Sequence, residues 1–165
     1  MLSLNDQQNQ VISCGHDNLI LIIEFSNRNW NVIQKVKADC IGRQLCFINN
    51  NQFTFKPKSG NLMHIYEMNS VTKQFTKTKD IIINQGDDCQ ILFPQQYLKQ
   101  KQVLTNRHDK FDNFIRKTQN GEFRLEQSIL FGSNSIFGPL SDEENYLITW
   151  NDSSKEIQIR KYKEE

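Results

Sequence analysis

The feature that most constrains how this chain folds is a pattern of short apolar runs that recurs along its 165 residues. The segments VISCGHD, FTFKPKSG, VLTNRHD and LITWNDSS begin at positions 11, 53, 103 and 147, which are 42, 50 and 44 residues apart. A second apolar run follows each segment, and an aromatic residue begins a third run at Trp30, Phe75 and Phe123. Several features that recur at similar spacings indicate copies of one small unit, each packed on its neighbours.

The runs are rich in β-branched and aromatic residues, and clusters of Asn, Gly, Ser, Asp and Lys separate them. Runs of this kind predict strands, and the three prolines leave no long helical pattern intact. We predict fourteen strands, at residues 10–14, 19–25, 30–36, 44–48, 52–56, 62–68, 75–83, 90–94, 102–106, 113–117, 123–130, 135–140, 146–150 and 156–162. The chain is therefore expected to be all-β.

A repeat of this length with four short strands is typical of a β-propeller blade. One four-stranded sheet has two apolar faces and cannot bury both alone, so blades stack face to face. We predict about four blades of four antiparallel strands, three full ones and a leading partial one, within a single domain. The approximate units are 1–29, 30–74, 75–122 and 123–165.

Two segments carry a resemblance to a known family. SCGHDNLILIIE stands where WD40 repeats have a Ser-x-x-x-Asp motif, a short turn and an apolar strand, and LSDEENYLITW is similar to their Ser-Pro-Asp-Gly segment. The chain resembles a WD40 region along its whole length, with degenerate repeats. The Trp-Asp positions of that family hold Ile23-Glu24, Tyr66-Glu67, Arg116-Lys117 and Arg160-Lys161. Because WD40 rings usually close with about seven blades, the resemblance implies an incomplete ring. The chain would then be either a fragment of a larger propeller, which we favour, or a half-ring completed by another chain.

Charge and cysteine content favour an intracellular protein without cofactors. The chain has 20 Lys and Arg against 19 Asp and Glu, so no net field favours nucleic acid or a membrane. The longest apolar stretch, residues 19–23, is far too short to cross a bilayer, and no apolar run begins the chain. The four cysteines, Cys14, Cys40, Cys46 and Cys89, form no CxxC pair, which argues against zinc. We expect no metal, no cofactor and a location in the cytoplasm or nucleus.

His-Asp pairs occur twice, as His16-Asp17 and His108-Asp109, at the same offset of five residues from the start of their runs. The equal offset places the two pairs on corresponding hairpins of two repeats. An Asp carboxylate accepts a backbone hydrogen bond in such turns, and Asn18 tolerates a left-handed conformation. We interpret the two pairs as equivalent turns.

The sequence offers no complete set of parts for catalysis. It has no Gly-x-Ser-x-Gly elbow, phosphate loop, dinucleotide fingerprint or HExxH motif. Cys14 lies two residues from His16, without the orientation that a thiolate–imidazole pair requires. The consecutive acids Asp87-Asp88 and Glu143-Glu144 would point to opposite faces of a strand. We therefore predict that the chain is not an enzyme and has no small-molecule substrate.

The predicted function is a non-catalytic protein-interaction scaffold, since loops on a rigid framework are where recognition usually occurs. The partner would be a protein or peptide, or the remaining blades of a propeller; a rim without any partner is the simpler alternative. The candidate rim residues are His16, Asp17, Asn18, Asp39, Arg43, Lys58, Asp87, Asp88, Arg107, His108, Asp109 and Asp152. A second candidate function is a phosphate- or RNA-binding strip formed by Arg116, Lys117, Arg160 and Lys161.

Overall fold

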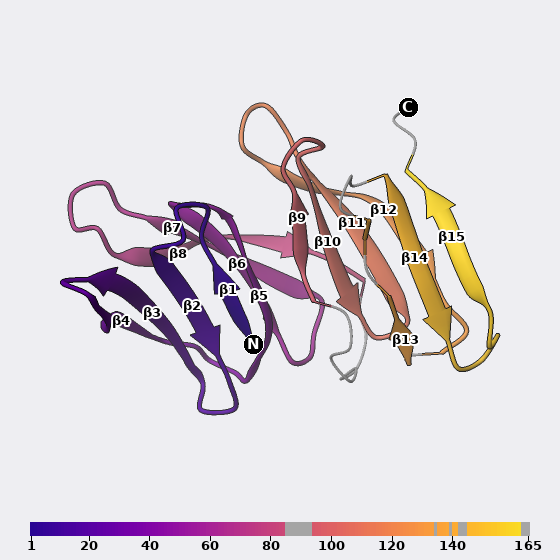
Figure 1. The fold of residues 1–165 in the computed structure, drawn as a ribbon, viewed down its shortest axis with the longest axis horizontal. Coiled ribbons are helices and arrows are strands. Elements are labelled where there is room, and N and C mark those ends of the chain that lie inside the picture. Colours follow the sequence, from indigo (N-terminus) through magenta and orange to yellow (C-terminus); the bar gives the residue numbers. More distant parts are fainter. Residues whose placement is uncertain (85–93, 134, 139, 142–144, 163–165) are drawn as a thin grey trace. The chain divides into compact units, whose positions relative to one another are not determined.

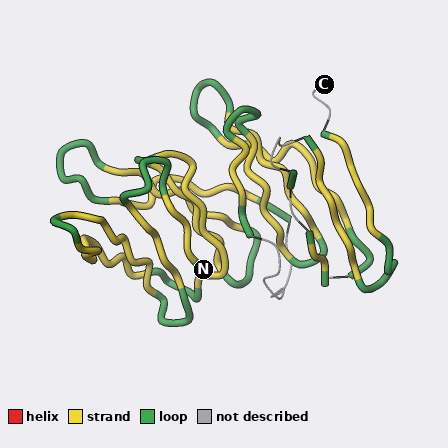
Figure 2. Tube along the Cα trace, in the orientation of Figure 1, coloured by secondary structure: helices red, strands yellow, loops and turns green. Residues whose placement is uncertain are grey.

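The computed structural model of the chain describes residues 1–84, 94–133, 135–138, 140–141 and 145–162. These residues form strands joined by turns and loops, with no helix among them (Figures 1 and 2). The described part therefore contains no helix that could cross a membrane. The chain divides into two compact units, Met1–Gln85 and Gly86–Glu165.

Each unit contains two antiparallel sheets, and the strands of each sheet follow one another in the chain. The sheets of the first unit are β1 (Leu2–Leu4), β2 (Gln10–Cys14), β3 (Leu19–Ser26) and β4 (Asn29–Lys37), and then β5 (Gly42–Asn49), β6 (Gln52–Pro57), β7 (Leu62–Met68) and β8 (Phe75–Ile82). The sheets of the second unit are β9 (Gln96–Leu98), β10 (Val103–His108), β11 (Phe111–Lys117) and β12 (Phe123–Leu130), and then β13 (Ile136–Phe137), β14 (Tyr146–Asn151) and β15 (Ile157–Lys161).

These sheets confirm the predicted fold class of propeller-like blades made of antiparallel strands. The sheet with three described strands is the last one, whereas the sequence placed the partial blade first. The aromatic residues Trp30, Phe75 and Phe123 lie at the start of β4, β8 and β12, the fourth strand of each complete sheet. The predicted strand at 90–94 lies outside the described residues, except for Pro94, and β9 is the strand that pairs with β10.

A β-bulge recurs at one place in all three four-stranded sheets. Between the third and fourth strands, the pairing skips one residue at Ile33, Thr78 and Glu126. These positions are 45 and 48 residues apart, which is the spacing of the aromatic residues that begin the fourth strands. The repeat therefore extends to the backbone geometry, because a bulge bends and twists its strand in the same way in each copy.

In the first unit, the core lies between the two sheets. Ile12, Ile20 and Ile22 of the first sheet pack against a group of aromatic side chains of the second sheet: Phe47, Phe53, Phe55, Tyr66 and Phe75. Alternate residues of each strand face this core, because successive side chains of a strand point to opposite faces. Gln34 of β4 also joins the sheets, since its side chain accepts from the Phe75 amide at 2.8 Å and donates to the Phe75 carbonyl at 2.8 Å.

In the second unit, the described core holds several polar groups. Leu98, Val103, Phe114 and Leu147 form its apolar cluster. Further along β10 and β11, polar and charged side chains are buried on both faces of the sheet, with Asn106, His108 and Asn113 on one face and Arg107 and Asp112 on the other. Nη1 of Arg107 donates to the carbonyl of Ile136, which ties this polar stretch to the last sheet.

Candidate active site

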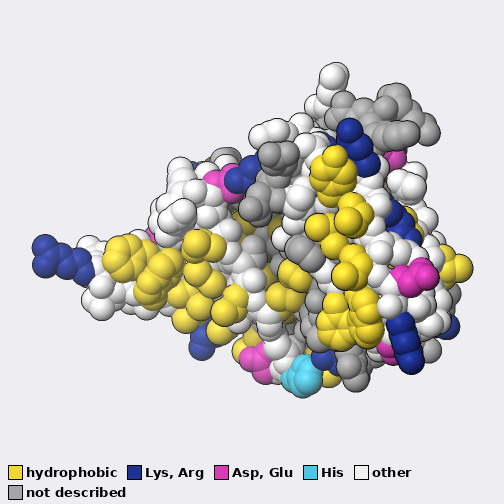
Figure 3. All heavy atoms as spheres, turned by 45° about the vertical axis from the view of Figure 1, so that its right-hand side comes forward, with side chains coloured by type: hydrophobic (Ala, Val, Ile, Leu, Met, Phe, Trp, Pro, Cys, Tyr) yellow, Lys and Arg dark blue, Asp and Glu magenta, His cyan; other side chains and the backbone are white. Residues whose placement is uncertain are grey.

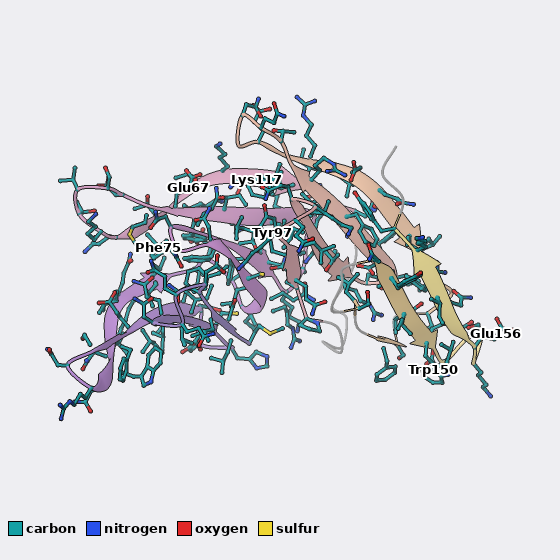
Figure 4. All side chains as sticks on the ribbon, turned by 45° about the horizontal axis from the view of Figure 1, so that its top comes forward. Glu67, Phe75, Tyr97, Lys117, Trp150 and Glu156 are labelled. Atoms are coloured by element: carbon teal, nitrogen blue, oxygen red, sulfur yellow. The ribbon has the colours of Figure 1, made fainter. Side chains whose placement is uncertain are left out.

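A pocket of about 430 Å³ opens between the two sheets of the first unit. One wall is the end of β4 and the connection that follows it, residues 34–40. The other wall is the core-facing side of the second sheet, with Phe55, His64 and Tyr66 and the beginning of β8. Phe75, labelled in Figure 4, belongs to both this pocket and the aromatic core. The pocket thus has an aromatic floor and polar groups at its edge.

Asp80 contacts two side chains at this edge. Its Oδ1 lies 2.5 Å from His64 Nδ1 and 2.9 Å from Lys77 Nζ. His64 and Asp80 are paired directly across β7 and β8, so their side chains project from the same face. Lys77 reaches this face because the bulge at Thr78 adds one residue, whereas residues three apart in a regular strand point to opposite faces.

The ionised form of Asp80 is favoured. Burial raises the pKa of its carboxyl, but the hydrogen bonds from Lys77 and His64 outweigh that effect and bring the pKa below its ordinary value. An ionised carboxylate only accepts hydrogen bonds, so Nδ1 of His64 is the donor. In the neutral ring, Nε2 then holds a lone pair.

His64 lines the pocket, and its Nε2 atom is not fully enclosed. This atom makes no hydrogen bond with the described part of the chain. The His64 ring stacks on Phe55, with the ring centroids 6.0 Å apart and an interplanar angle of 13°. The stacking and the contact with Asp80 together fix the ring orientation, as is usual for a histidine that transfers protons.

Tyr66 lies two residues from this histidine along β7 and also lines the pocket. Its ring stacks on Phe53, with centroids 4.9 Å apart, and the residue is only 4% exposed. Within the described residues the hydroxyl makes no hydrogen bond, and its oxygen is not fully enclosed. Burial, followed by the charges of Asp39, Cys40 and Asp80, raises the pKa of Tyr66. The phenol therefore keeps its proton at neutral pH and can donate it in a hydrogen bond.

The thiols of Cys40 and Cys14 are poor nucleophiles. Burial, followed by the Asp39 charge, raises the pKa of Cys40, which lines the pocket. Burial also raises the pKa of Cys14 to about 11, and no hydrogen bond joins it to His16, whose Nε2 lies 3.3 Å from Arg43 Nη1. Because the thiolate is the reactive form, neither cysteine is activated. The pocket groups therefore support general-base catalysis with water as the nucleophile.

No three His, Cys, Asp or Glu side chains of the described segments are grouped so that they could hold a metal ion. His64 and Tyr66 line the same pocket, where a neutral imidazole can accept a proton and a phenol can donate a hydrogen bond. This arrangement suits the attack of water on a carbonyl carbon, where a base takes the proton of the water and a donor stabilises the oxyanion.

Most of the predicted rim residues lie in exposed turns. His16, Asp17 and Asn18 form the turn between β2 and β3, where Oδ1 of Asp17 accepts from the Leu19 amide at 3.2 Å and Asn18 has a φ of 57°. Asp109, with a φ of 55°, begins the two-residue turn between β10 and β11. Asp39, Arg43, Lys58 and Asp152 lie in or next to other loops, with Asp39 also beside the pocket.

The rim prediction needs a correction at Arg107 and His108. Both residues are strand residues of β10 and are 2% exposed, so their side chains do not reach a partner at the rim. The two His-Asp pairs occupy the same hairpin, but the first has a longer loop and the second a tight turn, which leaves His108 inside the sheet. Asp87 and Asp88 lie outside the described residues.

Three of the four residues of the predicted basic strip contact groups of their own unit. Nε of Arg116 pairs with Glu126 Oε1 at 2.6 Å, and its Nη1 donates to the Lys101 carbonyl at 3.0 Å. Arg160 lies over the Phe131 ring, 5.0 Å from its centroid. Lys117 likewise lies over the ring of Phe123. The guanidinium groups of Arg116 and Arg160 are therefore engaged by their own unit.

The predicted site residues do not include His64, Tyr66 or Asp80. His64 and Asp80 lie within the predicted strands at 62–68 and 75–83, and Tyr66 was considered only as part of a degenerate Trp-Asp position. His64 and Tyr66 are two residues apart and so share a face, which is a signal present in the sequence. Their partners on β8 depend on strand register and on the bulge, which the sequence does not give.

No protein-family model matches this chain, and no curated protein matches it. Several solved structures match it at low sequence identity. A candidate 6-phosphogluconolactonase from Bacteroides uniformis is 13% identical, with a TM-score of 0.71 over 99% of this chain and 50% of that chain. A chain of a mitotic checkpoint complex is 12% identical, with a TM-score of 0.73 over 99% of this chain and 48% of that chain. A protein from Lactobacillus plantarum is 9% identical, with a TM-score of 0.72 over 98% of this chain and 51% of that chain.

These matches correct two predictions. The expectation of no enzyme rested on missing catalytic motifs, and that of a non-catalytic scaffold on loops carried by a rigid framework. The match to a candidate 6-phosphogluconolactonase contradicts both, because such an enzyme can have this fold. The chain spans about half the length of the proteins that it matches, and at these identities the similarity establishes the fold alone. The chain has a β-propeller-type fold.

Proposed function

We propose that this chain is a propeller-fold hydrolase that acts on small lactones or esters in the pocket of the first unit. The observation that carries the proposal is the His64–Asp80 pair, 2.5 Å apart, at the edge of a pocket of about 430 Å³. The name of the matched Bacteroides uniformis protein, a candidate 6-phosphogluconolactonase, supports the lactone class as the first substrates to test.

In the proposed reaction, His64 Nε2 accepts a proton from water while the water oxygen bonds to the carbonyl carbon. The electron pair of the carbonyl bond moves to its oxygen, which accepts a hydrogen bond from Tyr66. When the tetrahedral intermediate collapses, the bond to the leaving oxygen breaks and His64 returns the proton to it. The products are a carboxylic acid and an alcohol, or a hydroxy acid from a lactone, and no cofactor is consumed.

We also propose that the repeats of this chain are WD40-like. The period of 42 to 50 residues and the Asp-containing hairpin turns support WD40-like repeats with degenerate motifs. Under this proposal the hairpin Asp residues stabilise turns, and the pocket between the first two sheets is a separate feature with its own chemistry.

The test measures hydrolysis of 6-phosphogluconolactone and of p-nitrophenyl acetate by the purified chain. We expect His64→Gln to lower kcat/KM by about 100-fold or more, because it removes the base. Tyr66→Phe should lower kcat by a similar factor with little change in KM, because the hydroxyl acts on the oxyanion and the ring stacking is preserved.

The matched control is His16→Gln, which changes an exposed histidine in a turn of the same unit and should keep full activity. Circular dichroism of each variant checks that the fold is intact. Wild-type chain that turns over neither compound above the buffer rate would refute the proposal, as would a His64→Gln variant with the activity of the control.

A further inference from the structure

The first sheet presents an apolar face that no other sheet of its unit covers. Its core face packs on the second sheet, while the opposite face carries Leu2, Leu4, Phe25, Trp30 and Val32. These five side chains are between 46% and 68% exposed. They share a face because Leu4 aligns with Val11, Ile23 and Val32 across the strands, and Phe25 pairs with Trp30. We call this surface the first open face.

The last sheet of the chain has a similar surface, which we call the last open face. Cross-strand pairs place Phe137 with Trp150, Trp150 with Ile157, and Ile148 with Ile159 on one side of β13–β15. Phe137, Tyr146, Ile157 and Ile159 are 39% to 71% exposed. The other side of β14 carries Leu147, which belongs to the core of the second unit. Hydrophobic side chains gather in patches of this kind on the surface in Figure 3, and Trp150 is labelled in Figure 4.

Exposed side chains of this kind and number on one sheet face indicate a contact surface. Single apolar residues at a surface are ordinary, but contiguous patches mark binding sites. A propeller sheet buries both faces only when it has a neighbour on each side. Within its own unit, each of these two sheets has one neighbouring sheet, against its other face.

We propose that a second copy of this chain covers both open faces, with the first open face of each copy against the last open face of the other. The lengths of the matched structures support a second copy, because this chain covers 48% to 51% of three of them. Two copies therefore supply as much chain as one such protein. Two identical contacts related by a twofold axis would bury all four open faces at once.

The residues on the two faces suit this contact. Trp30, Phe25 and Phe137 are large aromatic side chains, which dominate the energetics of interfaces, and Ile157 and Ile159 are branched aliphatic side chains able to pack against them. The stacking of sheets in the first unit uses the same combination, in which isoleucines of one sheet meet aromatic rings of the next.

The test is sedimentation of the 165-residue chain over a wide range of concentrations. We expect a species of twice the chain mass of 19.5 kDa. The variants Ile159→Glu on the last open face and Val32→Glu on the first open face should each shift the protein to the monomer. Both positions are exposed in one copy, so circular dichroism should show that the fold is retained.

The matched control is Val71→Glu, which changes a valine that is 86% exposed in the turn between β7 and β8 and lies on neither open face. It should leave the dimer unchanged. A wild-type chain that stays monomeric at every concentration overturns the proposal. A dimer that survives either glutamate substitution also overturns it, because closure in this arrangement requires both faces. Neither result depends on the hydrolase assay.

Discussion

Asp112 is a carboxylic acid held in the interior of the second unit. It is 1% exposed and lies opposite Arg107 in the pairing of β10 and β11. Its two carboxylate oxygens are enclosed and accept no hydrogen bond from the described residues. Burial raises its pKa to about 7, although the charges of Arg107 and Arg160 act in the opposite direction. Desolvation of the charged form is thus the larger effect.

This raised pKa predicts a pH dependence of stability. Between about pH 4 and pH 7 the folded chain holds a proton that the unfolded chain releases, so the free energy of unfolding should fall as the pH rises through this range and then level off. Urea denaturation at several pH values measures the slope. Asp112→Asn should reduce it, while Glu156→Gln, at an exposed position, should not. An unchanged slope in Asp112→Asn would contradict the assignment.

At the scale of elements, the first two sheets approach closely at Gly42, the first residue of β5. A Cβ atom on Gly42 would lie 2.4 Å from Phe55 Cε2 and 2.8 Å from Cys14 Cβ. Such distances are too short for a packed interior, so the sheets would have to move apart. The pocket lies between these same sheets, so its shape depends on this approach.

Gly42→Ala should therefore lower the free energy of unfolding by about 1–3 kcal/mol, as overpacking usually does. Gly15→Ala is the control, because a Cβ atom there meets only Asp17 Oδ1, at an ordinary 3.5 Å. Chemical denaturation of the two variants measures the difference. If they are equally stable, the two sheets are not in tight contact at this glycine.

At the scale of the whole molecule, stability should depend on assembly. If a second copy covers the two open faces, unfolding includes dissociation, so Tm should rise with protein concentration. Differential scanning calorimetry at several concentrations should show this rise for the wild-type chain and none for Ile159→Glu. A wild-type Tm that is independent of concentration would contradict the dimer.

The sequence predicted the strands well because their pattern is local. Alternation, turn residues and the recurrence of Trp30, Phe75 and Phe123 are all visible within a few residues, and the structure places these aromatic residues at matching points of three sheets. The prediction from sequence failed at His108, because the His-Asp pair there adjoins a shorter turn than the pair at His16. Turn length there follows from the strand pairing, which the dipeptide does not specify.

The contacts of the candidate site could not be predicted from the sequence. Gln34 and Cys40 reach the pocket from the first sheet and the connection after it, and His64 reaches it from the second. Asp80 is brought to His64 by register, and Lys77 by an additional residue in the strand. None of these contacts has a signature in the order of the residues, because pairing across strands is set by the sheet as a whole.

The sequence by itself determined that this chain forms repeated all-β units, because hydrophobic alternation and period act over short distances and each unit must bury an apolar face. Only the tertiary structure decided which side chains meet: it brought His64 and Tyr66 to one pocket and Asp80 to His64, enclosed Arg107 and His108, and left Trp30 and Ile159 exposed. The physical reason is that burial and contact depend on which face of a sheet has a neighbour.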